Sequence, residues 1–338
     1  MNFIKSILLI ILLIPTISHA IIYIYTGNIG QNKAEFYFDD LYTIYLDNNE
    51  YQVKKLSSIG KNNDVYKFKS YYVTSPEEVI DEVFIKKLDS DTFYDLKHNY
   101  QQLTGNTLSG NKIDLHKIFE YDIYNKNRLD EAEFNNIDFL QENSTKDFYF
   151  KLVISKKKKE AAKIVSIKVL SKKDGRLIQT ITGVKGGVFE SFTHITTGND
   201  DYNFDDDNND FSIGSLLFNG RGGARVIAEY YSYDKKQKKY VKLNLKGNDI
   251  RLDSKTKTAT DYKLCFSRKT EGRIELNDTF QYMGNNHYKQ IKTQCQYIEY
   301  LENGNKQRAC TSQEITNCRR SLDDDDNDDN YYDIYDED

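Results

Sequence analysis

The chain has 338 residues, enough for two domains of ordinary size, and a formal net charge of −5. It contains 27 Tyr and 18 Phe but only 2 Pro and no Trp, which favours β-structure because aromatic residues suit the half-buried surface of a sheet. The run of four lysines at 156–159 predicts a solvated turn, since nucleic-acid binding needs a wider basic face. We therefore expect no nucleic-acid partner.

The first twenty residues predict a signal peptide. Lys5 supplies a positive charge, residues 7–14 form an unbroken apolar run, and Ser18 and Ala20 are small residues of the kind that precede a cleavage site. The apolar run is too short for a membrane anchor, because a helix needs about 20 apolar residues to span a bilayer. Residue 21 is Ile rather than Cys, which gives no obvious site for lipid attachment. We expect cleavage after Ala20 and a periplasmic or secreted protein with no stable membrane anchor.

Residues 21–110 predict an N-terminal β-module. Short runs of aromatic and β-branched residues are separated by turn residues, a pattern typical of a β-meander. Within this region, residues 75–84 are compatible with a helical turn, because Ser75 is a suitable cap and Glu78 follows three positions later. The segment 103–112, LTGNTLSGNK, is rich in Gly, Asn and Ser and predicts the domain boundary.

Residues 111–320 predict a second, C-terminal β-module that binds calcium. Its clearest element is a hairpin at residues 163–183, where apolar residues alternate and Asp174-Gly175 supplies the turn. The even spacing of the expected strands suits a sandwich, a barrel or a small propeller. The sequence therefore predicts an all-β, mainly antiparallel protein, sandwich or small propeller-like, with two β-modules.

Four cysteines lie in the last quarter of the chain: Cys265, Cys295, Cys310 and Cys318. An even number of cysteines in an exported chain predicts disulfides, and four cysteines allow three pairings. Zinc would need closely spaced pairs of ligands, whereas only the last two cysteines are close, with seven residues between them. We favour a small loop closed by Cys310–Cys318, together with Cys265–Cys295.

Residues 321–338 predict an acidic, disordered tail. The last sixteen residues carry ten acids and no base, and a block of like charges cannot bury itself. Once these ten acids and Lys5 of the signal peptide are set aside, residues 21–322 carry a charge of +4. The tail is therefore either a solubilising end or an arm for a cationic partner.

The stretch DDYNFDDDNNDFSI, residues 200–213, is a candidate calcium site. Six of its fourteen residues are Asp, which would crowd unless they were splayed in water or neutralised by an ion. Calcium prefers many oxygen ligands, and oxygens at every second residue of a tight loop can converge on one ion. The candidate ligands are Asp201, Asn203, Asp205, Asp207 and Asp210. The alternative is a solvated acidic loop without an ion.

One familiar type of calcium loop does not match this stretch. The helix–loop–helix site needs Gly at the sixth position and Glu at the twelfth. These positions hold Asp206 and Ser212, so a strict match is excluded. A loop in a β-context with a different final ligand stays open.

Several segments between Phe148 and Tyr297 resemble, in the same order, a family of exported β-rich bacterial proteins. These segments are IVSIKVLSKKDGRLIQTITG, DYNFDDDNNDFSI, FNGRGGAR, YYSYDKKQKKYVKL, RLDSKTKTATDYKLCFSR and DTFQYMGNNHYKQIKTQ. The family includes periplasmic immunity proteins against lysozyme-like toxins, which are similar in shape to the periplasmic inhibitors of invertebrate-type lysozyme. The resemblance implies an all-β domain that binds calcium.

The resemblance also implies ligand positions. Asp201, Asn203 and Asp205 match the first three ligands of the family loop. The family glycine corresponds to Asp206, and the final family Asp falls on Asn209, or on Asp210 if the loop carries one inserted residue. Because glycine adopts this turn freely, its replacement predicts backbone strain at position 206.

The sequence predicts no enzyme. The histidines of the expected mature chain form no pair with metal-ligand spacing, and the G-x-S-x-G, P-loop and Rossmann patterns are absent. The expected function is that of an exported, calcium-stabilised binding protein, an inhibitor or immunity protein against a lysozyme-like cell-wall hydrolase. The alternative is a calcium-stabilised structural or adhesive surface protein, and a third candidate is a polysaccharide-active enzyme.

Overall fold

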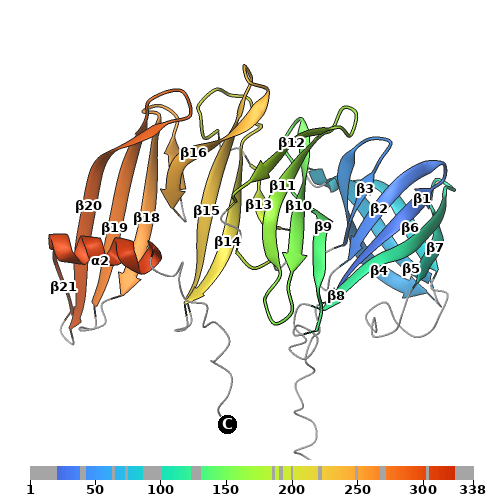
Figure 1. Cartoon of the computed structure of the whole chain (residues 1–338), viewed down its shortest axis with the longest axis horizontal. Coiled ribbons are helices and arrows are strands. Elements are labelled where there is room, and N and C mark those ends of the chain that lie inside the picture. The colour runs from blue at the N-terminus through green and yellow to red at the C-terminus, as the bar shows by residue number, and fades with distance from the viewer. Residues whose placement is uncertain are drawn as a thin grey trace, which may run out of the picture.

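The computed structural model describes residues 21–38, 43–62, 65–72, 75–86, 101–122, 131–184, 187–189, 193–198, 201–219, 223–247, 250–266, 272–301 and 304–323. Antiparallel strands make up a barrel and three smaller sheets, which lie in a row (Figure 1). The prediction of an all-β, mainly antiparallel fold is confirmed. The expected signal peptide and the acidic residues after Asp323 lie outside the described ranges.

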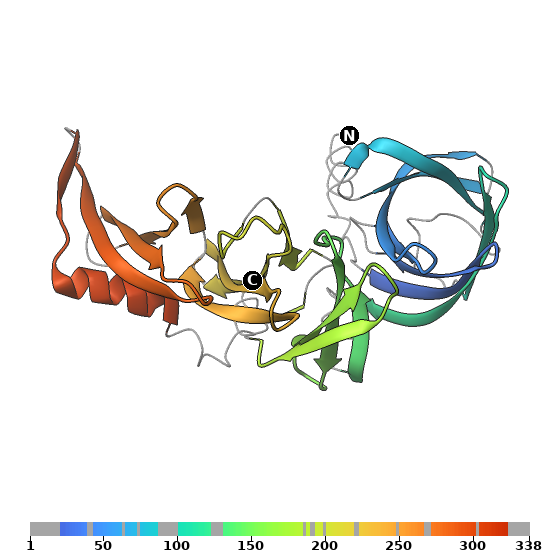
Figure 2. The same ribbon diagram turned by 90° about the horizontal axis from the view of Figure 1, so that it is seen from above.

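Eight strands form the barrel: β1 (Ile21–Ile29), β2 (Asn32–Phe38), β3 (Thr43–Asp47), β4 (Gln52–Asn62), β5 (Val65–Tyr72), β6 (Ser75–Lys86), β7 (Gln102–Thr107) and β8 (Lys112–Asp122). Each strand pairs with the next, and β8 also pairs with β1, which closes the ring seen in Figure 2. The strand β8 lies beyond residue 110, where the sequence placed the end of the N-terminal module.

The expectation of a helical turn at residues 75–84 is wrong, because this segment lies inside β6. The segment pairs with β5 along its length, and its cap-like start is outweighed by that pairing and by its branched and aromatic residues. Residues that resemble a helix cap carry no information about the neighbouring strand with which the folded segment pairs.

Side chains along the barrel strands point alternately inward and outward, and this alternation divides the apolar residues between two cores. On β1, Tyr23 and Tyr25 belong to an apolar cluster whose members come from strands all round the barrel, so this cluster fills the barrel interior. Ile22 and Ile24, the alternate residues, belong instead to a second cluster that includes residues of the next two sheets. The barrel is therefore both a filled unit and one wall of a larger core.

The second and third sheets follow in chain order. The second sheet contains β9 (Phe134–Leu140), β10 (Phe148–Lys156), β11 (Lys163–Ser171) and β12 (Leu177–Thr182). The third sheet contains β13 (Ile195–Thr196), β14 (Phe211–Asn219), β15 (Gly223–Asp234) and β16 (Lys239–Gly247). The predicted hairpin at residues 163–183 is confirmed as β11 and β12.

The glycine of this hairpin turn is needed for two reasons. Gly175 has a φ of 68°, a conformation that other residues rarely adopt. A Cβ at this position would lie 2.2 Å from the ring of Tyr51, which belongs to the turn between β3 and β4 of the barrel. The turn therefore packs closely against the barrel, and a larger residue would separate the two.

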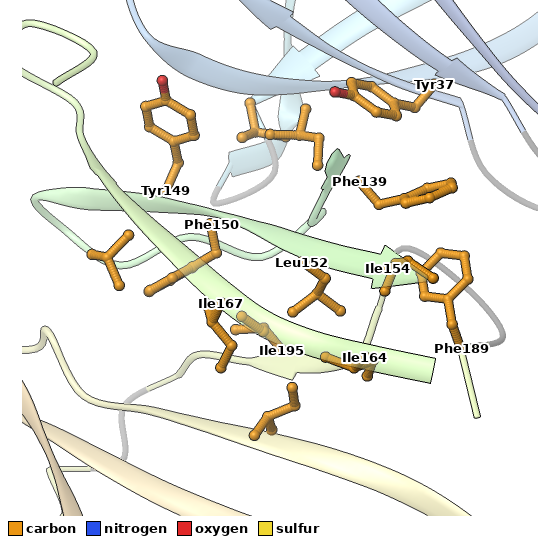
Figure 3. Close-up of a cluster of buried hydrophobic side chains, with 14 of the residues drawn as sticks. Tyr37, Phe139, Tyr149, Phe150, Leu152, Ile154, Ile164, Ile167, Phe189 and Ile195 are labelled. Atoms are coloured by element: carbon orange, nitrogen blue, oxygen red, sulfur yellow. The ribbon is translucent and has the colours of Figure 1, made fainter. Parts of the chain in front are cut away.

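The second sheet is the middle layer of the large core. Figure 3 shows Tyr37 and Tyr149 between the barrel and this sheet, and Leu152, Ile167 and Ile195 between this sheet and the third. Each of these side chains is almost wholly buried, with exposed fractions of 2% or less. Burial on both faces explains the nearly continuous apolar character of β10.

The fourth sheet contains β17 (Ile250–Asp253), β18 (Thr258–Phe266), β19 (Gly272–Tyr282), β20 (Tyr288–Leu301) and β21 (Gly304–Ala309), and the helix α2 (Ser312–Asp323) packs on one of its faces. The helix begins with a capping box: the Thr311 hydroxyl accepts from the Glu314 N–H, and the Glu314 carboxylate accepts from the Thr311 N–H. No helix in the described part of the chain has the length and apolar character needed to span a bilayer.

The structure contains two disulfides, Cys265–Cys318 and Cys295–Cys310, so the favoured pairing is wrong. Antiparallel pairing of β20 with β21 places Cys295 across from Cys310, with Cα atoms 5.4 Å apart, and α2 carries Cys318 back to β18. Sequence spacing could not anticipate this strand register or the helix. Two disulfides indicate an oxidising, extracytoplasmic environment.

Candidate functional site

The acidic loop, residues 201–210, connects β13 to β14 at the junction of the second, third and fourth sheets. All five predicted calcium ligands lie in it. Its base is closed by Asp210, whose carboxylate accepts hydrogen bonds from the Tyr202 N–H at 2.8 Å and the Tyr233 N–H at 3.1 Å. Because Tyr233 belongs to β15, Asp210 fixes both ends of the loop to the third sheet.

Aromatic residues anchor the loop in the protein. The side chains of Tyr202 and Phe204 pack into the apolar cluster between the third and fourth sheets. The Tyr288 hydroxyl donates to the Tyr202 carbonyl at 2.5 Å, and the Tyr240 hydroxyl donates to the Asn209 carbonyl at 2.6 Å. The alternating aromatic and acidic residues therefore place the aromatic rings inside and leave the carboxylates to form the outer loop.

Asn209 ties the loop to the second sheet. Its side-chain oxygen accepts from the Asp147 N–H at 3.0 Å, and its amide nitrogen donates to the Asp147 carboxylate at 2.9 Å. The resemblance left the final ligand position open between Asn209 and Asp210. In the structure the amide of Asn209 is engaged by Asp147, whereas Asp210 faces the loop.

The carboxylates of the loop also shape its backbone. The two oxygens of Asp201 accept from the N–H groups of Asp205 and Asp206, at 3.0 and 2.8 Å. Shorter turns follow, in which Asp205 accepts from Asp207 and Asp207 accepts from Asn209. These local hydrogen bonds gather Asp201, Asp205 and Asp207 into one compact loop.

Asp206 has the left-handed conformation expected at the glycine position of the family loop. Its φ is 59°, and Phe204 and Asn208 on either side also have positive φ values. Such conformations are costly for residues other than glycine, and least so for Asp and Asn. The loop therefore carries backbone strain at the predicted position, and its hydrogen bonds and aromatic anchors hold that strain in place.

Two carboxylates of the loop are buried and electrostatically unfavourable. Burial raises the pKa of Asp210 to about 8, with further contributions from the charges of Asp207 and Asp201. Burial, with the neighbouring Asp205, also raises the pKa of Asp207. The Oδ2 atom of Asp207 is buried and has no hydrogen-bond partner in the part of the chain that the structure describes, so this oxygen is desolvated without full compensation.

Lys235 forms ion pairs with the acidic loop, and the sequence reasoning missed this neighbour. Its Nζ lies 3.3 Å from Asp205 Oδ2 and 3.6 Å from Asp207 Oδ2, and its side chain is more than half exposed. The sequence feature that could have indicated this lysine is the basic turn DKKQKK in the hairpin that follows the loop. A mobile lysine on a hairpin turn can partly neutralise the loop from outside.

The donors of the loop suit a hard cation, although their side chains are not arranged as a complete coordination shell. In the described residues no group of three or more His, Cys, Asp or Glu side chains converges in a way that could hold a metal ion. The oxygens that accept one backbone N–H each retain a second lone pair, and Asp207 Oδ2 accepts none. Carboxylate and amide oxygens are the ligands that calcium prefers. The donor atoms of the loop are thus of the kind that calcium prefers.

Comparisons with known proteins add no family to this description. No protein family model matches the sequence, and no curated protein shows significant similarity to it. The functional argument therefore depends on the geometry of the loop and on the resemblance described above.

Proposed function

We propose that this chain is an exported binding protein whose acidic loop holds a calcium ion with a structural role. The observation that carries the proposal is the buried Oδ2 of Asp207, which has no hydrogen-bond partner among the described residues and lies 3.6 Å from the Nζ of Lys235. A divalent cation would neutralise this oxygen together with the buried Asp210. The ion would hold the second, third and fourth sheets in one arrangement, because the loop contacts all three.

The proposed ligands are the side chains of Asp201, Asn203, Asp205, Asp207 and Asp210. Asn203 is buried, and its side-chain oxygen already accepts from the Asp205 N–H at 3.1 Å. Four of these residues supply oxygen atoms at alternate positions, and Asp210 follows three positions later. Such a set suits the flexible, oxygen-rich coordination of calcium better than the strict octahedron of magnesium. The role assigned to the ion is the stabilisation of the fold, and the proposal includes no catalytic step.

The proposed target is a lysozyme-like cell-wall hydrolase, which makes the protein an inhibitor or immunity protein. The support is the resemblance between residues 148 and 297, together with loops that are held on a rigid β-scaffold, as inhibitors commonly require. The two disulfides support a location outside the cytoplasm, and the expected signal peptide supports export to the periplasm or beyond.

The target proposal is tested with the chain from Ile21 to Asp338 and a lysozyme-like hydrolase encoded beside it. The protein is expected to bind the hydrolase and to block lysis of peptidoglycan. A second form that ends at Asp323 keeps α2 and its disulfide but lacks the acidic tail. If the tail only steers a cationic hydrolase, this form should associate more slowly but still inhibit. Failure of the intact protein to bind or protect would reject the inhibitor role.

The alternative is a calcium-stabilised structural or adhesive surface protein. The observation that favours it is the elongated row formed by the barrel and three sheets (Figure 1), which exposes several separate sheet faces and edges. This alternative predicts calcium-dependent stability without any hydrolase inhibition. The hydrolase assay therefore distinguishes the two functions.

A further inference from the structure

The two faces of the fourth sheet differ in chemistry. One face carries Ile274, Leu276 and Tyr297 and packs against α2, where the apolar cluster also includes Cys318. Figure 2 shows α2 along one side of this sheet, with the opposite side uncovered by any described element. On that opposite side lies a shallow pocket of about 460 Å³. The pocket is lined by Glu275, Asn277, Gln294, Cys295, Gln296, Gln307, Arg308 and Ala309.

Strand register places Glu275, Asn277 and the three glutamines of this pocket on one face, whereas the Arg308 side chain lies with Tyr297 on the face of α2. Glu275 on β19 is directly opposite Gln296 on β20, and Asn277 is directly opposite Gln294. Gln296 donates its amide N–H to the side-chain oxygen of Gln307 on β21 at 2.7 Å. Three neighbouring strands therefore contribute four amide side chains to one continuous surface, which we call the amide face.

The amide face has unused hydrogen-bonding capacity and little net charge. The structure gives the side-chain amides of Asn277 and Gln294 no hydrogen bond to any described residue, so both retain donors and an acceptor. The carboxylate of Glu275 is paired with the guanidinium of Arg273 at 2.7 Å. In a chain with 29% charged residues, this cluster of neutral amides offers hydrogen bonds without a net charge that would favour an ionic partner.

Apolar and aromatic side chains border the amide face. On the neighbouring strand β18, Tyr262 is opposite Asn277 and Leu264 is opposite Glu275, with 38% of Leu264 exposed. At the other end, Tyr300 is 40% exposed and lies beneath the guanidinium of Arg273. Flat, partly exposed side chains beside a row of amides can contact the apolar ring faces of a sugar while the amides contact its hydroxyls.

We propose that the amide face binds a neutral oligosaccharide. Each carboxamide both donates and accepts hydrogen bonds, which matches sugar hydroxyls, and the paired Glu275 adds no net charge that would favour a cationic ligand. The Cys295–Cys310 disulfide links β20 to the end of β21 directly beneath the pocket. This covalent link limits relative movement of the two strands, so less ordering of the protein is needed on binding. The site is separate from the acidic loop and does not depend on calcium.

The test uses the chain from Ile21 to Asp338 with two probes, chitohexaose and cellohexaose, measured by calorimetry and by NMR of side-chain amide groups. The amide signals of Asn277 and Gln294 are expected to shift with at least one probe. A response to chitohexaose alone assigns recognition to the N-acetyl groups, and a response to both assigns it to the hydroxyls. Each titration is made once with chelator and once with calcium. Equal binding in the two conditions is expected, because the site is separate from the acidic loop.

Variants identify the surface that binds. The double change Asn277→Ala and Gln294→Ala is expected to weaken binding about tenfold, since it removes at least two hydrogen bonds of ordinary strength. Gln313→Ala removes an exposed amide from α2 on the opposite face and should bind like the wild type. Asn277→Asp with Gln294→Glu keeps the side-chain shapes, removes the amide donors and should also weaken binding. The proposal is overturned if neither probe shifts the amide signals, or if the double variants bind as tightly as the wild type.

Discussion

Two groups of buried acids in this protein are neutralised in different ways. The first group, Asp261 and Asp278, faces α2 in the fourth sheet, and the second group is Asp207 and Asp210 of the acidic loop. Asp278 accepts hydrogen bonds from Arg319 and Thr293, each at 2.7 Å. Asp261 Oδ2 lies 2.9 Å from Lys263 Nζ, although this buried oxygen, like Asp207 Oδ2, makes no hydrogen bond in the described part of the chain. The first group is therefore compensated by cations that belong to the same sheet and helix.

The acidic loop lacks comparable compensation. In the described part of the chain its carboxylates form ion pairs with Lys235, whose Nζ is 3.3 Å or more from the nearest carboxylate oxygens. Burial raises the pKa of Asp210 to about 8, and Asp207 keeps a buried oxygen without a hydrogen bond. A buried charge is costly unless it is paired, so the more distant lysine of the loop supports the proposal that a bound cation completes its neutralisation.

The largest predicted effect of a single substitution comes from removing a cation of the first group. Arg319→Met should lower the free energy of unfolding by about 3 kcal/mol, because it leaves Asp278, which is 3% exposed, without its guanidinium partner. Chemical denaturation measures this loss. Calcium should not restore the lost stability, since the affected acids lie outside the loop. Full recovery on adding calcium would show that the two groups are not independent.

The pH dependence of stability provides a second way to distinguish the two groups of buried acids. The folded-state pKa of Asp210, about 8, is above its ordinary value of 3.8, so the folded protein holds this proton more tightly than the unfolded chain. The contribution of the Asp210 proton to the free energy of unfolding is complete below pH 3.8 and is lost as the pH rises to about 8. In chelator, stability should therefore fall across this window, by at most about 1.4 kcal/mol per pH unit.

Denaturation at pH values from 4 to 8 measures this slope. Asp210→Asn is the control, because it removes the titrating group and should flatten the slope whatever its effect on absolute stability. With calcium added, the stabilisation by the ion should grow as the pH rises, since the ion binds the ionised carboxylates. An equal slope in the wild type and in Asp210→Asn would assign the pH dependence to other groups.

The smallest predicted effect concerns the partial compensation by Lys235. Its side chain is 56% exposed, so Lys235→Met in chelator should change stability only slightly. The same variant should bind calcium several-fold more tightly, because the ion no longer competes with the lysine for Asp205 and Asp207. Calorimetric titration measures the affinity, and Lys236→Met on the same turn serves as the matched control. Weaker calcium binding by the Lys235 variant would contradict the competition.

Residue pattern was sufficient to predict the fold class and the hairpin. Alternating aromatic and branched residues identify strands, and Asp174-Gly175 identifies a tight turn, because both signals are local. The closed barrel and the second layer of burial could not be predicted in the same way. They depend on the pairing of β8 with β1 and on Tyr37 and Tyr149 joining one apolar cluster, although these residues are far apart in the sequence.

The candidate site was predicted more completely than the disulfides. The ligand residues of the acidic loop lie within ten positions, so spacing alone brings them together. Lys235 was missed because it approaches from another hairpin, and Cys265–Cys318 was missed because α2 had no recognised helical pattern. The composition of a short segment identifies the donor atoms of a local site. Residues that approach from other elements can be identified only from the tertiary structure.

The most direct test of the central claim is thermal unfolding of the chain from Ile21 to Asp338 in chelator and in excess calcium. A ligand that binds only the folded state stabilises it by about 2.7 kcal/mol at a hundredfold excess over Kd, so the melting temperature should rise by several degrees. Asp201→Ala and Asp205→Ala should each abolish the rise, whereas Asp174→Ala, at a turn outside the loop, should retain it. An unchanged melting temperature of the wild type in excess calcium would contradict the assignment of the acidic loop as a calcium site.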